Sequence, residues 1–217
     1  MTGGCRSSHC VATARHFDGA IAARDLERYL KDGPDLTTRL LLDSLRGSIS
    51  PESTLLDVGS GIGVVSFELL AAGMGSATLV DASPSYLEVA GVEAQRRGIE
   101  TRLNLVPGNF VAVAGRFSVA DVVVLDRVVC CYPDYRALLE SALSRCRGLL
   151  GLSYPRDRWY VRAMIGFENL VRRTKGDEFR AFVHPEAALE SIVVKAGLRR
   201  LSRRSSLVWR ADVYGAP

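Results

Sequence analysis

The sequence lacks any long apolar run. No stretch of its 217 residues approaches the ~18 consecutive apolar residues that a membrane-spanning helix requires. Residues 1–14 also lack the extended apolar stretch of a secretory signal peptide, so we expect a cytoplasmic protein. The five cysteines are an odd number and predict no complete disulfide framework. Together these absences predict a globular protein with no membrane partner, and the length suits one domain.

The chain also lacks a large net charge. Its formal charge of +4 is too small to predict a nucleic-acid partner by itself. The arginines of the last third could bind an anionic substrate or form a solvated face, and both interpretations stay open. These arginines are Arg156, Arg158, Arg162, Arg172, Arg173, Arg199, Arg200, Arg203 and Arg204. We predict no metal site, because Cys5, His9 and Cys10 lack an evident fourth ligand.

A glycine-rich loop follows a short apolar strand within Leu55–Gly63. Asp57 comes near the end of the strand, and glycines then stand at positions 59, 61 and 63. Glycine adopts positive φ readily and leaves the backbone open to a ligand. A dinucleotide fingerprint would need its third glycine at Val64, and the Asp57 carboxylate would repel a pyrophosphate. The acid suits a ligand with an ammonium group instead, while a turn that binds no ligand is the structural alternative.

Strand and helix patterns alternate after residue 50. The predicted strands cover 54–58, 76–80, 101–106, 119–125 and 148–153, and the predicted helices cover 62–72, 84–97 and 134–147. This alternation is typical of a parallel sheet with helices on both faces. Cys146 continues the apolar face of the last helix, which predicts a core position for it. Residues 198–214 alternate enough for two more strands, one of which would insert antiparallel.

Two further segments flank this α/β pattern. Helical patterns at about 18–31 and 35–45 precede it, and an insertion at about 155–183 is rich in aromatic residues and arginine. We expect residues 1–48 to form an N-terminal helical segment and residues 49–217 to form the main domain. No linker separates the two, so we predict a single folded unit.

The loop pattern D-x-G-x-G-x-G at 57–63 resembles motif I of the class I S-adenosylmethionine-dependent methyltransferases. The resemblance implies a Rossmann-like sheet of seven strands, mostly parallel, with a C-terminal antiparallel hairpin. It also implies S-adenosyl-L-methionine as cofactor, S-adenosyl-L-homocysteine as product, and an N-terminal helical lid. The cofactor-binding residues that we predict are Asp57, Val58, Gly59, Ser60, Gly61, Gly63, Asp81, Ala82, Gly108, Asn109, Phe110 and Asp126.

Two of these positions have specific predicted roles. Asp81 ends the second strand and follows Gly63 by 18 residues, close to the ~20 expected of an acid that binds ribose hydroxyls. A carboxylate accepts hydrogen bonds from a diol with both oxygens. Methyltransferases often carry Gly-Asp-Phe after the third strand, where this chain has Asn109, whose amide oxygen could accept a hydrogen bond from adenine. A helix cap at Asp81 and a plain turn at Asn109 are the structural alternatives.

The segment after the fourth strand, Arg127–Pro133, resembles that of the magnesium-protoporphyrin O-methyltransferases and proteins like them. In that group a histidine commonly precedes the Tyr-Pro pair, and Cys131 stands there in this chain. The acceptor in that group is a propionate carboxylate, and Arg127 could hold an anionic acceptor or pair with a structural acid. The acceptor-side residues that we predict to be catalytic are Tyr29, Arg127, Cys131 and Tyr132.

These patterns favour a methyltransferase that acts on a small molecule by O-methylation of an anionic or hydroxyl acceptor. A carboxylate acceptor needs no general base, whereas a hydroxyl benefits from one. An RNA or protein methyltransferase that uses the basic insertion is one alternative. A non-catalytic S-adenosylmethionine-binding module and an NAD-dependent dehydrogenase are two others. We expect a monomer or homodimer with a small-molecule substrate and no nucleic-acid partner.

Overall fold

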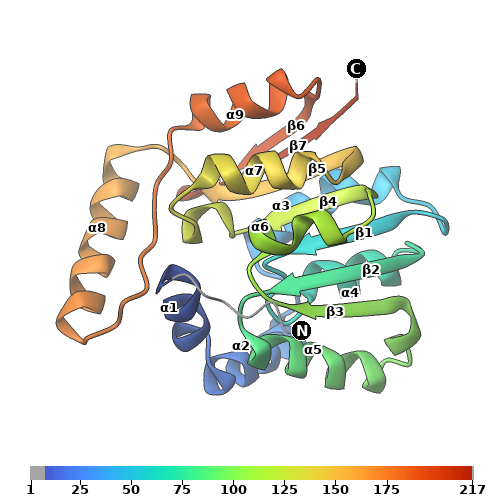
Figure 1. Ribbon diagram of the computed structural model, residues 1–217, viewed down its shortest axis with the longest axis horizontal. Coiled ribbons are helices and arrows are strands. Elements are labelled where there is room, and N and C mark those ends of the chain that lie inside the picture. The colour runs from blue at the N-terminus through green and yellow to red at the C-terminus, as the bar shows by residue number, and fades with distance from the viewer. Residues whose placement is uncertain (1–7, 217) are drawn as a thin grey trace.

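A seven-stranded sheet forms the centre of the computed structural model, which describes residues 8–216 (Figure 1). Its strands are β1 (Thr54–Val58), β2 (Ser76–Asp81), β3 (Leu103–Pro107), β4 (Ala120–Asp126), β5 (Cys146–Pro155), β6 (Arg199–Ser205) and β7 (Trp209–Gly215). Their order is β3-β2-β1-β4-β5-β7-β6, with the first five parallel and β7 antiparallel to both of its neighbours. The predicted Rossmann-like sheet, mostly parallel with a C-terminal antiparallel hairpin, is confirmed.

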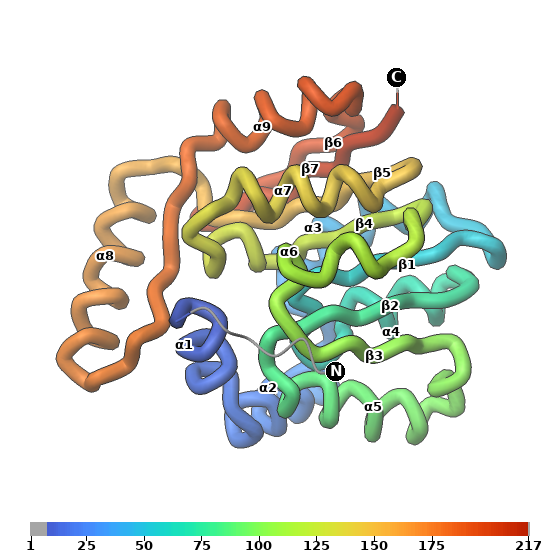
Figure 2. The backbone as a smooth tube through the Cα atoms, in the orientation of Figure 1, coloured from blue at the N-terminus to red at the C-terminus, as the bar shows by residue number. Residues whose placement is uncertain are grey.

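Helices cover both faces of this sheet (Figures 1 and 2). One layer holds α3 (Leu36–Leu45), α4 (Val64–Ala71) and α5 (Pro84–Arg96), and the other holds α6 (Phe110–Val113), α7 (Tyr135–Leu143) and α9 (Glu186–Lys195). In β4, Val122 and Val124 join the core of the first layer, whereas Val123 and Leu125 join that of the second. Successive side chains of a strand point to opposite faces, so a strand covered on both sides is apolar throughout.

Helices also gather at the edge where the parallel strands end (Figure 1). They are α1 (Ser8–His16), α2 (Gly19–Asp32) and α8 (Trp159–Thr174). The Asp18 side chain caps α2 by accepting from the Ile21 N–H at 3.0 Å, and the helix ends at Gly33 with a φ of 75°. The Tyr86 hydroxyl donates to Asp25 at 2.6 Å and so fastens α2 to α5. Short 3-10 turns are η1 (Arg46–Ser48), η2 (Glu100–Arg102), η3 (Ala114–Arg116) and η4 (Val129–Cys131).

The N-terminal helices do not all lie where a lid was expected. The predicted lid covered residues 1–48, but α3 within that range belongs to the helical layer of the sheet. Its Leu41, Leu42 and Leu45 side chains are fully buried in the core, and the helix packs against β5 and β7. The apolar stripe of α3 is therefore a core stripe, and α3 reaches the strand ends only at its start, where the Thr38 hydroxyl donates to Asp126.

Cys146 also differs from its expected place. The helix α7 ends at Leu143, and Cys146 is the first residue of β5, paired with Ala120 of β4. Only two residues separate the end of α7 from the start of β5. Because both segments are apolar, the helical spacing of apolar residues continues by chance into the strand, and the sequence pattern extended the helix too far. The side chain is half-buried, and this burial raises the pKa of its thiol to about 11.

Candidate active site

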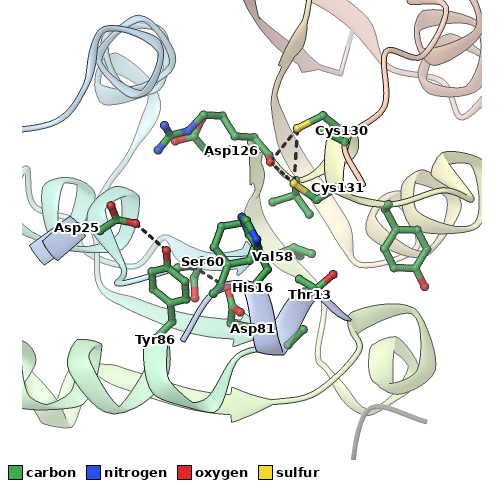
Figure 3. Close-up of a pocket in the computed structure, with 18 of the residues that line it drawn as sticks. Thr13, His16, Asp25, Val58, Ser60, Asp81, Tyr86, Asp126, Cys130 and Cys131 are labelled. Carbon is green, nitrogen blue, oxygen red and sulfur yellow. Dashed lines mark hydrogen bonds between the residues drawn. The ribbon is translucent and has the colours of Figure 1, made fainter. Parts of the chain in front are cut away.

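A cavity of about 500 Å³ lies at the carboxyl ends of the parallel strands, walled by the sheet edge, α1, α2 and α8 (Figure 3). Every predicted site residue except Gly63 lines it. The carboxyl ends of parallel strands meet at one edge of a sheet, which is where α/β proteins bind ligands. The glycine loop after β1, Asp81 at the end of β2, Asn109 after β3 and Arg127 after β4 consequently face the same space.

Two glycines of the loop are required by the fold itself. Gly59 has a φ of 63°, and a Cβ there would lie 2.5 Å from Cγ2 of Val128. Gly63 has a φ of 87°, and a Cβ there would lie 2.8 Å from Cδ2 of Leu79. Gly63 precedes α4 as its N-cap, so it allows α4 to approach β2. Its influence on any ligand is through the shape of the loop.

Asp81 connects the glycine loop to the start of α5. One carboxylate oxygen accepts from the Gly61 N–H at 2.8 Å, and the other accepts from the Ser83 N–H at 2.7 Å. The cap of α5 is the Ser83 hydroxyl, which accepts from the Tyr86 N–H, so α5 does not need Asp81 for this purpose. Burial raises the pKa of Asp81. A carboxylate has about four acceptor sites, so these contacts do not exhaust its capacity to accept.

Asp57 makes the floor of the cavity acidic. Its carboxylate is 1% exposed and accepts a hydrogen bond from the Ser66 hydroxyl at 2.7 Å. Burial raises its pKa to about 7, and the charges of Asp126 and Asp81 add to this rise. The buried hydroxyl oxygen of Ser60 in the same wall has no hydrogen-bond partner among residues 8–216. This wall favours a cationic ligand with hydroxyl or amine donors over a phosphate.

Asp126 and Arg127 follow each other at the end of β4, but they make separate contacts. The Asp126 carboxylate accepts from the Thr38 hydroxyl at 2.6 Å and from the Ser153 hydroxyl. Arg127 has a φ of 60°, and its guanidinium pairs with Asp35 at 2.5 Å. Such a backbone conformation costs ~1–3 kcal/mol in a residue other than glycine and tends to occur at functional sites. The sequence left two partners open for Arg127, an anionic acceptor or a structural acid, and in this structure its partner is the acid Asp35.

The other predicted acceptor-side residues have hydroxyls and thiols with defined partners. The Tyr132 hydroxyl donates to Asn109 Oδ1 at 3.1 Å, and this same oxygen accepts from the Val111 N–H as the cap of α6. A hydrogen bond from adenine would therefore be a third one at that atom. The Sγ atoms of Cys130 and Cys131 lie 3.7 Å apart. Their mutual hydrogen bond and burial raise the pKa of the Cys130 thiol.

Tyr29 lies in the cavity wall but is largely packed into the core. Its hydroxyl donates to Glu68 at 2.9 Å, and its ring stacks on Phe67 with the Arg97 guanidinium close by. Burial and the hydrogen bond to Glu68 raise its pKa to about 12. The hydroxyl is therefore protonated at neutral pH and already engaged as a donor.

Helix α1 contributes two histidines that the sequence did not place beside the predicted site residues. His9 lines the cavity with its ring edge-on to Tyr132, at 5.3 Å between ring centroids, and burial lowers its pKa. His16 Nδ1 lies 2.7 Å from Asp177 Oδ2, and its ring stacks on Phe179 at 4.4 Å. His16 and Asp177 stand 161 positions apart, so no local pattern could have paired them.

Within residues 8–216, histidine, cysteine and carboxylate side chains form no group of three that could hold a metal ion. Cys5, which the sequence offered as one such ligand, lies outside the described range. No helix in this range has the length and apolar character needed to cross a bilayer.

Comparison with protein families identifies the class. A family model described as "Methyltransferase domain" matches residues 49–164, which is more than half of the chain. The chain therefore belongs to the methyltransferase domain family. The predicted class, a methyltransferase, is confirmed.

Individual relatives agree with the class and differ in their substrates. The ribosomal protein L11 methyltransferase of Pelotomaculum thermopropionicum is 37% identical over 93 residues, which cover 42% of this chain and 29% of that protein. The chain thus matches less than a third of that relative's length.

Two solved structures share the fold over almost the whole chain. The magnesium protoporphyrin IX methyltransferase of Synechocystis PCC 6803, with bound S-adenosylhomocysteine, has a TM-score of 0.72 at 17% identity and covers 97% of this chain and 100% of its own. An O-methyltransferase family 2 protein of Planctomyces limnophilus, in complex with apigenin, has a TM-score of 0.69 at 16% identity, with coverage of 98% and 66%. At these identities the likeness concerns the fold.

Proposed function

We propose that this methyltransferase acts on a small molecule and methylates an oxygen atom of a hydroxyl or carboxylate acceptor. The observation that carries the proposal is one cavity of about 500 Å³ that is acidic at the strand ends and apolar toward α8. This volume lies in the range of roughly 300–1,000 Å³ that is typical of small-molecule sites. The apolar part is lined by Leu138, Pro155, Met164, Ile165, Phe179 and Trp209.

The acidic part fits S-adenosylmethionine. Its ammonium group would pair with the Asp57 carboxylate, and its ribose hydroxyls would donate to Asp81. The Ser60 hydroxyl, buried and without a described partner, offers a further contact. The remaining predicted cofactor contacts at the strand ends are Val58, Gly59, Gly61, Ala82, Gly108, Asn109, Phe110 and Asp126. A dinucleotide would fit this part poorly, because its phosphates would meet three carboxylates.

The bound cofactor supplies a methyl group that the positive charge of its sulfonium already activates. The protein must align the acceptor oxygen with the methyl carbon and the departing sulfur, and such positioning is worth up to ~7–11 kcal/mol. A hydroxyl acceptor also has to lose a proton. His9 lines the cavity beside Tyr132, and its lowered pKa keeps the imidazole neutral and able to accept that proton at pH 7.

An anionic acceptor would interact differently with the site. Arg127 is already paired with Asp35, so a carboxylate would have to compete with Asp35 for the guanidinium. A bidentate contact with a carboxylate is the geometry that arginine favours. The structures of a porphyrin methyltransferase and of an O-methyltransferase with bound apigenin support planar, largely apolar acceptors as the first compounds to test.

The cofactor assignment is tested by calorimetric titration of S-adenosylhomocysteine into the wild type and into Asp81→Ala. We expect the variant to bind more weakly by roughly 1.5–3 kcal/mol, as for the loss of hydrogen bonds to a charged group. Equal affinity of the two proteins would refute the ribose assignment. Methyl transfer from labelled S-adenosylmethionine to phenols and aromatic carboxylates then identifies the acceptor class.

A protein substrate is the second candidate, because the relative from Pelotomaculum is named as a methyltransferase of a ribosomal protein. The basic segment around α8 offers a surface for such a partner. Salt screens the attraction between this basic surface and a large polyanionic or acidic substrate, so the rate of its methylation would fall steeply as salt increases. The rate of transfer to a small enclosed acceptor would not. A steep salt dependence with ribosomal protein or RNA, and no transfer to small phenols or carboxylates, would replace the first proposal with this one.

A further inference from the structure

Helix α8 has an apolar outer face that faces solvent. Trp159 is 79% exposed, Phe167 68% and Leu170 57%. Ala163 stands between the first two, and spacings of four, four and three residues place all of these side chains on one side of a helix. None of them lines the cavity. The helix stands at the margin of the molecule, away from the sheet (Figure 1).

The opposite side of α8 accounts for its packing. Val161 is fully buried and Ile165 is 8% exposed, and Ile165 lines the cavity together with Met164. The helix is thus apolar on two sides, and the structure buries only one of them. The outer side therefore cannot be explained by the fold of residues 8–216.

The β6–β7 turn extends this outer side. Leu207 in the turn is 74% exposed, and its carbonyl accepts from the Tyr160 hydroxyl at 2.8 Å. We call Trp159, Phe167, Leu170 and Leu207 the α8 face. A contiguous exposed apolar surface of this kind marks an interaction site more often than single exposed residues do.

Basic side chains accompany the α8 face. From its N-cap Arg158 to its C-cap Lys175, the helix carries five basic residues and one acidic residue. Its net charge therefore equals the +4 of the whole chain, and the rest of the protein is balanced. Arg162 pairs with Asp157, but Arg173 and Lys175 have no ion-pair partner in the described part of the chain.

We propose that the α8 face docks the protein onto an anionic lipid surface, a partner that the sequence did not lead us to expect. Tryptophan, phenylalanine and leucine beside arginine and lysine are the side chains with which a helix lies in a charged membrane interface. The charge favours this partner over a second copy of the chain, because two such helices would repel each other. A helix is ~10 Å across, so docking would place the cavity about one helix diameter from the lipid.

The test is flotation of the purified protein with lipid vesicles. We expect binding to vesicles of phosphatidylcholine mixed with phosphatidylglycerol, and little binding to phosphatidylcholine alone. Phe167→Ser with Leu170→Ser should abolish it, while Val92→Ser, at a 63% exposed position on α5, is the matched control and should bind as the wild type does. Arg173→Gln with Lys175→Gln should weaken binding roughly 25-fold, since each basic residue near an anionic surface contributes about fivefold.

Further controls separate docking from misfolding and from other partners. Arg199→Gln with Arg204→Gln, on the edge strand β6, removes the same charge elsewhere and should leave flotation unchanged. All variants should bind S-adenosylhomocysteine with wild-type affinity, because none of the changed residues lines the cavity.

Several outcomes would overturn the proposal. Equal binding to neutral and anionic vesicles, or no binding to either, would exclude an anionic lipid surface as the partner. Dimerisation in ultracentrifugation that Phe167→Ser abolishes would assign the α8 face to a second copy. Binding of RNA, with no flotation, would assign it to nucleic acid. The result does not depend on which acceptor the enzyme methylates.

Discussion

Replacing Asp57 by asparagine should make the protein more stable at alkaline pH and weaken its cofactor binding. Asp57 is fully buried, and its pKa is raised from 3.8 to about 7. The folded state therefore holds this proton up to about pH 7, whereas the unfolded chain releases it near pH 4. The contribution of the group to stability is complete at low pH and is lost as pH rises from about 4 to about 7.

The full shift corresponds to roughly 4 kcal/mol. Between pH 5 and pH 8 the part that is lost amounts to roughly 2–3 kcal/mol. Asparagine cannot ionise, and its amide oxygen can still accept from the Ser66 hydroxyl. The free energy of unfolding of Asp57→Asn, relative to that of the wild type, should therefore increase by about that amount from pH 5 to pH 8.

Urea denaturation of both proteins at the two pH values measures this difference. Comparing the two proteins removes the contributions of other titrating groups, and Asp43→Asn, at an exposed position, is the control. In parallel, calorimetry should show weaker binding of S-adenosylhomocysteine to Asp57→Asn, because the ammonium loses its partner. A stability difference between the proteins that does not change with pH would refute the raised pKa of the buried Asp57. Unchanged cofactor affinity would refute its pairing with the ammonium.

Three further substitutions give distinct expected results. Gly63→Ala should lower the free energy of unfolding by roughly 2 kcal/mol or more, because alanine disfavours the positive φ and its Cβ would collide with Leu79 of β2. Gly98→Ala, which has a positive φ but open space around it, measures the backbone part alone in the same urea titration. His9→Gln should slow methylation of a hydroxyl acceptor by roughly 10²–10⁴-fold without changing S-adenosylhomocysteine affinity, and a normal rate would exclude His9 as the base. Tyr29→Phe should cost about 1 kcal/mol of stability through the lost bond to Glu68, and a large fall in kcat would instead support its predicted catalytic role.

Most of the sheet could be predicted from the sequence because its signals are local. The strands of a parallel sheet are short apolar runs, and glycines and acids mark where each one ends, as at Asp57 and Asp81. The cofactor side of the cavity follows from the same signals, since it is built from the ends of consecutive strands.

Other parts depend on contacts between distant residues, and the sequence could not supply them. Helix α1 was not predicted, since its place is set by contacts such as His16 with Asp177 and with Phe179. The core position of α3 was missed for a related reason. An apolar stripe indicates that a helix is covered, but not whether the covering surface is a sheet or a ligand.

This division explains why the donor could be inferred from motifs while the acceptor could not. One part of the cavity is lined by residues that follow directly from β1 to β4, whereas the other part is lined by side chains from α1, α8 and the segment between α8 and α9. The segment between α8 and α9 contacts the loop after β4 through His184, whose Nε2 lies within hydrogen-bond distance of the carbonyls of Val129 and Tyr132. Exchanging residues on these elements would change the shape of the acceptor side and leave the strand ends intact. Proteins that share this fold can therefore share a donor and methylate different acceptors.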